Sequence, residues 1–223
     1  MEKSTTHKEV HSNTYRLIPS HFPPIALFEN LLEPTELEAA YALESLTNDR
    51  LQDQAGNISL VAPEDRVTGP GTTAIMAAFT HTGIPSRFTD GRFGIYYAGL
   101  NLETALAESR FSRARFLQAT NEPPQMLTLR CYTCEVHTEL VDLRADAQVH
   151  NPDSFIYAQT IGRQLKAQNE MGILYQSVRY SGGECIAALR PKALTPPAIQ
   201  TGHYQFYWDG NLITHVLAVE TIF

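Results

Sequence analysis

The chain has 223 residues, of which 43% are hydrophobic and 18% are charged. This composition predicts an ordered globular protein, and the length suits a single domain. Seventeen basic residues against twenty-four acidic residues give a formal net charge of −7. A protein whose main task is to bind long polyanions needs a basic face, so the charge excludes that class.

Apolar side chains spaced three or four residues apart predict four helices. We expect these at residues 34–48, 72–81, 101–116 with Asn101 as the N-cap, and from the cap pair Asn151-Pro152 to residue 165. Residues 1–14 are polar and are predicted to be flexible, and residues 49–70 are predicted to form a loop.

Runs of β-branched and aromatic residues predict the strands. They are expected at residues 15–18, 93–98, 126–136, 140–143, 172–176 and 185–189, with a terminal hairpin of 204–208 and 211–219 around Asp209-Gly210. Because strands outnumber helices and the two kinds are interspersed, the sequence predicts an α+β fold with a mixed or split sheet.

The cellular location is predicted from what the sequence lacks. No apolar run is long enough for a transmembrane helix, and the N-terminus has no apolar signal segment. Three cysteines suggest no disulfide framework, so we expect a cytoplasmic protein. Cys131 and Cys134 form a C-x-x-C pair within a predicted strand, where residues three apart point to opposite faces. We therefore expect two half-buried thiols and no metal site.

Common catalytic signatures are absent. The sequence has no P-loop, no G-x-S-x-G motif and no H-E-x-x-H motif, and Gly69-x-Gly71 is too short for a dinucleotide fingerprint. The densest candidate segment is residues 86–108, SRFTDGRFGIYYAGLNLETALAE. Glu108 falls about two turns into the predicted helix, near its packed face. There it is either functional or, as helical glutamates commonly are, paired with Ser112 or Arg115 or exposed.

Three segments of the sequence resemble the RES domain, a family named for an arginine, a glutamate and a serine and found in toxins of type II toxin–antitoxin systems. The segment 86–108 resembles its central motif and GILYQSVRYSGGECIAAL its serine motif, while Tyr15-Arg16 resembles its opening pair. The resemblance spans residues 15–223 and implies an NAD-binding domain with a fold like that of ADP-ribosyltransferases.

The spacing departs from the family in one place. Residues 17–65 separate Tyr15-Arg16 from the central motif and form a probable insertion relative to compact members. Arg66 is closer to the spacing of those members than Arg16 is, so either residue is a candidate for the family arginine.

The resemblance implies that the protein consumes NAD by cleaving the nicotinamide–ribose bond. Glu108 would stabilise the positive charge that develops on the ribose, and Ser177 would hydrogen-bond to the ribose or the carboxamide. Arg87, with Arg16 or Arg66, would bind the pyrophosphate. Either Tyr96 or Tyr97 would stack on nicotinamide, since alternation along a strand places only one of them on the site face.

The resemblance leaves the ADP-ribose acceptor open between water, phosphate and a protein. It also implies a partner, a cognate Xre-type antitoxin with a helix-turn-helix that would bind the DNA and possibly occlude the NAD site. A non-catalytic RES-fold interaction module is the alternative function. A nucleic-acid-binding regulator is disfavoured by the charge and by the lack of a helix-turn-helix pattern.

The charge is unevenly distributed along the chain. Residues 66–115 contain six arginines, no lysine and three acidic residues, a net charge of +3, so the remainder carries −10. A local pocket for a small dianion such as NAD is therefore compatible with an acidic protein. Arg110, Arg113 and Arg115 are expected to lie on a solvated helix face.

Overall fold

The computed structural model describes residues 6–19, 56–220 and 222. The predicted helix at 34–48 lies outside these residues, as does most of the predicted insertion. None of the described helices is long and apolar enough to cross a lipid bilayer.

A seven-stranded mixed sheet forms the body of the molecule, in the order β1-β2-β5-β4-β3-β6-β7. Its strands are β1 (His7–Pro19), β2 (Tyr96–Gly99), β3 (Gln125–Asp142), β4 (Gly172–Gln176), β5 (Glu184–Ala188), β6 (Leu194–Trp208) and β7 (Ile213–Val219). Only the β3–β4 pair is parallel, and β1 also pairs with β3, so the sheet closes on itself. The predicted α+β fold with a mixed sheet is confirmed.

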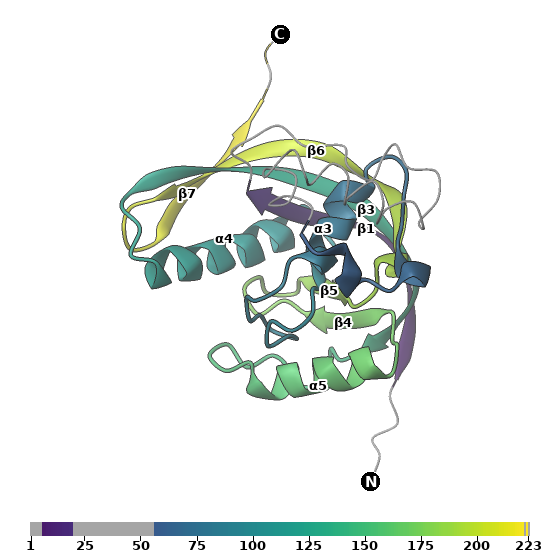
Figure 1. The fold of residues 1–223 in the computed structure, drawn as a ribbon. Coiled ribbons are helices and arrows are strands. Elements are labelled where there is room, and N and C mark those ends of the chain that lie inside the picture. Colours follow the sequence, from purple (N-terminus) through teal and green to yellow (C-terminus); the bar gives the residue numbers. More distant parts are fainter. Residues whose placement is uncertain (1–5, 20–55, 221, 223) are drawn as a thin grey trace.

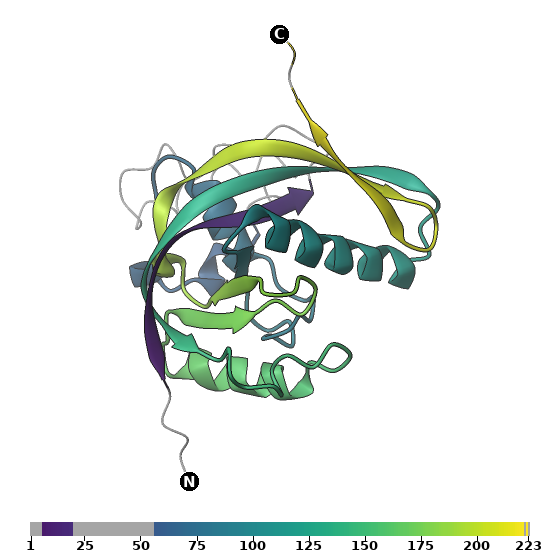
Figure 2. The ribbon, with the colours of Figure 1, turned by 180° about the vertical axis from the view of Figure 1, so that it is seen from behind.

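In the part of the chain that the structure describes, three α-helices pack against this sheet (Figures 1 and 2): α3 (Thr72–Thr80), α4 (Leu102–Ala119) and α5 (Ile156–Ala167). The long strands β3 and β6 arch over α4, whose Leu117 packs with Phe206 and Trp208. On α5, Ala158 and Leu165 join an apolar cluster with residues of β4 and β5. The strands β4 and β5 therefore lie between α4 and α5. The segments that follow β4 and β5 extend to these two helices.

The N-terminal strand begins earlier than predicted. Residues 1–14 were expected to be flexible, but β1 starts at His7 and pairs with β3 from His7–Val141 to Pro19–Leu129. Its polar outward residues carry no strand pattern of their own. Pairing with an already formed neighbour supplies the backbone hydrogen bonds that fix them.

Other boundaries also differ from the prediction. The two strands expected at 126–136 and 140–143 form one continuous β3, while β2 is shorter than expected and β6 is longer. The last helix begins at Ile156, not after Asn151-Pro152. The Asn151 side chain instead accepts hydrogen bonds from the backbone N–H groups of Asp153 and Ser154, which forms a turn before the helix.

The prediction for the C-x-x-C pair was wrong about burial. Cys131 and Cys134 are free thiols that are each only 1% exposed. The β3–β6 register shifts between Cys131 and Tyr132 and again before Glu135, and buried positions change from odd to even numbers there. The extra residues at both shifts lie on β6, and β3 pairs with β1 without interruption, so Cys131 and Cys134 lie on opposite faces of a strand that is covered on both faces.

Candidate active site

The carboxyl group of Glu108 lies against the segment that follows β4. Glu108 is half-buried on α4, and its Oε1 accepts a hydrogen bond from Ser177 Oγ at 2.6 Å and another from the Val178 N–H at 3.1 Å. Within the described residues, Oε2 makes no hydrogen bond or ion pair. The expected alternatives, a contact with Ser112 or Arg115 or full exposure, are not observed there.

A tight turn holds Ser177 in place. Its hydroxyl oxygen accepts hydrogen bonds from the N–H groups of Arg179 and Tyr180 at 3.1 and 3.0 Å, and its own N–H donates to the carbonyl of Gly183. Gly183 lies so close to Thr104 on α4 that a β-carbon there would collide with the threonine side chain. The turn and the helix are therefore fixed to each other, and Ser177 uses its only O–H on Glu108.

Arg87 is 7% exposed and lies in the loop before β2. One of its amino groups donates to the carbonyls of Val149 and Asn151 at 2.8 and 3.1 Å. Its guanidinium also lies 4.7 Å from the ring centroid of Phe155. Three contacts to residues 149–155 thus fix the orientation of this arginine.

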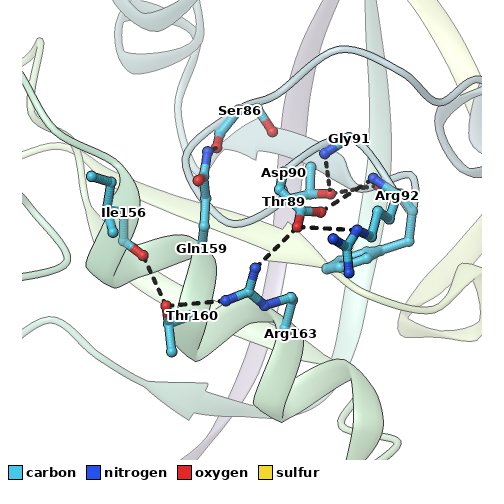
Figure 3. Close-up of polar contacts among 10 residues, drawn as sticks. Ser86, Thr89, Asp90, Gly91, Arg92, Ile156, Gln159, Thr160 and Arg163 are labelled. Atoms are coloured by element: carbon cyan, nitrogen blue, oxygen red, sulfur yellow. Dashed lines mark hydrogen bonds and ion pairs between the residues drawn. The ribbon is translucent and has the colours of Figure 1, made fainter.

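The loop that carries Arg87 is attached to α5 (Figure 3). Gln159 donates to the carbonyl of Ser86 at 3.0 Å, and Arg163 donates to Asp90 at 3.0 Å. Gly162 lies against the carbonyl of Phe88, where a β-carbon would have no room. Glycine is required at this helix position because the loop backbone packs directly on the helix.

The two tyrosines of β2 point to opposite faces, as alternation requires. Tyr96 is fully buried in the apolar cluster around α3. Tyr97 is half-buried, and its hydroxyl contacts Ser86 Oγ and accepts from the Phe88 N–H, both at 2.9 Å. Burial raises the pKa of Tyr97 to about 12. Tyr97, and not Tyr96, is on the face of the Arg87 loop.

The two candidate family arginines have different surroundings. Arg16 donates to the carbonyl of Tyr97 at 3.1 Å and lies over the Tyr96 ring, and its Nε is buried with no partner among the described residues. Burial lowers the pKa of Arg16. Arg66 is 5% exposed, and its Nε donates to the carbonyl of Val61 within its own loop. The geometry places Arg16 beside the strand of Tyr97.

Arg179 is a site residue that the sequence reasoning missed. Its guanidinium lies 3.3 Å from the centroid of the Phe111 ring, and it donates to the carbonyl of Pro152 at 2.8 Å. Burial lowers its pKa, while the charge of Glu108 opposes this shift. The sequence could have pointed to Arg179 through its position two residues after Ser177, inside the same motif.

Two arginines of α4 also belong to this region. Arg115 lies 5.0 Å from the Phe155 centroid, on a ring that Arg87 also contacts. Arg113 is half-buried, and its pKa is lowered by burial and by the charge of Arg16. The prediction that both lie on a solvated helix face was therefore wrong for Arg113 and incomplete for Arg115.

A cavity of about 320 Å³ lies elsewhere, lined by residues that include Phe79, Lys166 and the Asp65–Arg190 ion pair. Neither Glu108 nor Ser177 lines it. Across the described ranges, no group of three His, Cys, Asp or Glu side chains gathers in a way that could hold a metal ion.

The family model of the RES domain matches residues 63–209. The chain belongs to the RES domain family. A relative named "Uncharacterized protein y4oC", from Sinorhizobium fredii (strain NBRC 101917 / NGR234), is 30% identical over 208 residues, 92% of this chain and 87% of that protein. Among solved structures, a chain of the M. tuberculosis MbcT–MbcA toxin–antitoxin complex matches with a TM-score of 0.47 and 11% identity, covering 96% of this chain and 86% of that chain.

The range matched by the RES model contains Arg66, Arg87, Tyr97, Glu108 and Ser177. It begins after Arg16, which lies in β1. The family match and the geometry therefore favour different residues as the opening arginine, Arg66 by sequence range and Arg16 by position.

Proposed function

We propose that this RES-domain protein cleaves the nicotinamide–ribose bond of NAD, with Glu108 as its catalytic residue. The observation that carries the proposal is the state of Glu108: Oε1 is held by Ser177 and Val178, while Oε2 makes no hydrogen bond or ion pair within the described residues. A carboxylate fixed by one oxygen presents the other in a defined direction, as electrostatic catalysis requires.

The reaction follows from this arrangement. The C–N bond between nicotinamide and the ribose breaks, its electron pair leaves with nicotinamide, and positive charge develops on the anomeric carbon and ring oxygen. Glu108 Oε2 stabilises that charge and accepts a hydrogen bond from a ribose hydroxyl. The nucleophile then bonds to the anomeric carbon and releases its proton. Ser177 acts as a positioning residue for Glu108, because its O–H is already donated.

The substrate is held by the candidate arginines and by Tyr97. Arg87 binds the pyrophosphate, since its guanidinium is a planar fork held in a fixed orientation. Tyr97 offers its ring to the nicotinamide, and Arg16 contributes a guanidinium that contacts the carbonyl of Tyr97 and has an unpartnered Nε. Arg66 is retained as the alternative family arginine.

The biological role is proposed from the family. The chain acts as a cytoplasmic toxin that depletes NAD or modifies a target with ADP-ribose, and an Xre-type antitoxin with a helix-turn-helix neutralises it. Expression in a bacterial host tests the toxin role: the wild-type chain should arrest growth, and Glu108→Gln should restore it. If both the wild-type chain and Glu108→Gln arrest growth, the toxicity does not depend on the chemistry of Glu108.

Nicotinamide release by the purified chain tests the enzyme. Glu108→Gln should lower the rate by at least about two orders of magnitude, the usual effect of removing one electrostatic stabiliser. Glu103→Gln is the matched control, because Glu103 is an exposed glutamate on the same helix. Undiminished release from Glu108→Gln would refute the assignment. No release by the wild-type chain would favour the non-catalytic interaction module.

The fate of the ADP-ribose distinguishes the acceptors. NAD labelled in its adenylate half is incubated with the chain and a cell lysate, in the presence and absence of phosphate. Label in free ADP-ribose indicates water, label in a phosphorylated ADP-ribose indicates phosphate, and label that precipitates with protein indicates a transferase.

A further inference from the structure

Three arginines from different parts of the chain gather around residues 149–155. Arg87 comes from the loop before β2, Arg115 from α4 and Arg179 from the turn after β4. Arg87 and Arg115 contact the same Phe155 ring at 4.7 and 5.0 Å. Arg179 donates to the carbonyl of Pro152, and its pKa is lowered mainly by burial, with smaller contributions from the charges of Arg87 and Arg115. Three guanidinium groups from separate elements therefore contact one short segment.

These arginines lack the partners that other arginines of the chain have. Arg144 pairs with Asp142 and Glu184, Arg190 pairs with Asp65, and Arg163 pairs with Asp90. Within the described ranges, Arg87, Arg115 and Arg179 form no ion pair. Glu108 and Asp153 act on Arg179 with opposite charge, but among the described residues neither forms an ion pair with the three arginines. Three guanidinium groups that lack a paired carboxylate indicate a site for a negatively charged ligand.

The guanidinium groups are also held ready for a ligand. Arg179 lies on the Phe111 ring and Arg115 on the Phe155 ring, and cation–π contacts of this kind fix the plane of the fork. The Nε of Arg179 is buried and has no hydrogen-bond partner among the described residues. A buried donor without a partner costs stability unless a ligand satisfies it.

We propose that Arg115 and Arg179, together with Arg87, bind the two phosphates of a nucleoside diphosphate group. The inference rests on the proposed function and extends it, because neither Arg115 nor Arg179 has a role in the reaction above. Glu108 lies beside Arg179, since the Ser177 hydroxyl that donates to Glu108 accepts a hydrogen bond from the backbone N–H of Arg179. A ligand that joins a diphosphate to a ribose would reach both groups at once.

The test measures ADP and adenosine binding to the full chain by calorimetry. Arg179→Gln and Arg115→Gln should each weaken ADP binding by about tenfold or more, because each removes a charge-assisted contact. Adenosine binding should not change. Arg179→Lys keeps the charge and loses the planar fork, so it should recover only part of the affinity. Lys192→Gln, an exposed cation in the short helix before β6, is the charge-matched control.

Kinetics supply a second readout. If NAD is turned over, Arg115→Gln should raise KM with little change in kcat, the signature of a contact made equally in the ground and transition states. Because the Arg115 side chain is exposed, Arg115→Gln should fold like the wild-type chain. Thermal melting of each variant shows whether it is folded.

The outcomes separate the two proposals. Wild-type ADP affinity in both glutamine variants, or no ADP binding by the wild-type chain, overturns the inference even if NAD is consumed. Loss of ADP binding in the variants supports the inference even if the wild-type chain releases no nicotinamide, in which case only the proposed reaction fails.

Discussion

Ser177 and Glu108, 69 residues apart in the chain, are joined by a 2.6 Å hydrogen bond between a hydroxyl and a carboxylate oxygen. The bond connects α4 to the turn after β4, and the N–H of Val178 donates to the same oxygen. The carboxylate is therefore oriented by two donors from one turn. Several consequences of this arrangement and its surroundings are open to measurement.

Removing the hydroxyl should impair the orientation of Glu108. We expect Ser177→Ala to lower kcat for nicotinamide release by about ten- to a hundredfold, since small displacements of a catalytic group have effects of this size. The free energy of unfolding should fall by about 1–2 kcal/mol, as a part-buried hydrogen bond is lost. Ser177→Thr keeps the donor and should recover much of kcat. Equal values of kcat for Ser177→Ala and the wild-type chain would contradict the positioning role of Ser177.

Gly162 should be intolerant of a side chain. In an ordinary helix interior Gly→Ala stabilises by roughly 0.5–1 kcal/mol. Here the methyl group would collide with the carbonyl of Phe88, so we expect Gly162→Ala to destabilise by about 1–3 kcal/mol, as overpacking does. The displaced loop carries Arg87, so KM for NAD should rise as well. Urea unfolding and kinetics test this, with the exposed Gln164→Ala on α5 as control. A stabilised variant with normal KM would refute the prediction.

Arg16 and Arg66 should respond differently to the same substitution. Arg16→Gln should reduce NAD turnover, because its unpartnered buried Nε lies beside Tyr97. Arg66→Gln should chiefly reduce stability, by about 1–3 kcal/mol, because it removes a buried hydrogen bond to a backbone carbonyl. Melting temperature and kcat/KM measured on both variants decide the question. The reverse pattern would identify Arg66 as the residue that acts on the substrate.

Tyr97 should make folding sensitive to alkaline pH. Burial raises its pKa from 10 to about 12, so the unfolded chain loses this proton first as the pH rises. The stabilising contribution is complete below pH 10 and is lost progressively between pH 10 and 12. At about 1.4 kcal/mol per unit of pKa shift, the loss amounts to roughly 2–3 kcal/mol.

Urea unfolding at pH 9, 10 and 11 measures this effect. Tyr97→Phe should lose less stability over that range than the wild-type chain does. At neutral pH the same variant should be less stable by about 1 kcal/mol, because the hydroxyl bonds to Ser86 and Phe88 are gone. Tyr207→Phe, at an exposed tyrosine, serves as the control. Parallel pH profiles for wild type and Tyr97→Phe would show that Tyr97 ionises alike in both states.

Local signals in the sequence were sufficient for the elements that depend on their own residues. Asn101 caps α4 as predicted, accepting from the Thr104 N–H at 2.8 Å. The terminal hairpin of β6 and β7 forms around Asp209-Gly210. In both cases the deciding interaction lies within a few residues of the signal. The beginning of β1 and the unbroken length of β3 depend instead on the pairing of each strand with the other, which no short window contains.

The sequence by itself determined the α+β class, the RES resemblance and the candidates Arg87, Glu108 and Ser177, because motifs and periodicity are properties of adjacent residues. It left open the choices between Tyr96 and Tyr97 and between Arg16 and Arg66. Only the tertiary structure decided which groups meet. It joined Ser177 to Glu108, separated Tyr97 from Tyr96, and placed Arg179 on the Phe111 ring. These contacts cross from one element to another, and their energies depend on burial and distance, which exist only once the chain has folded.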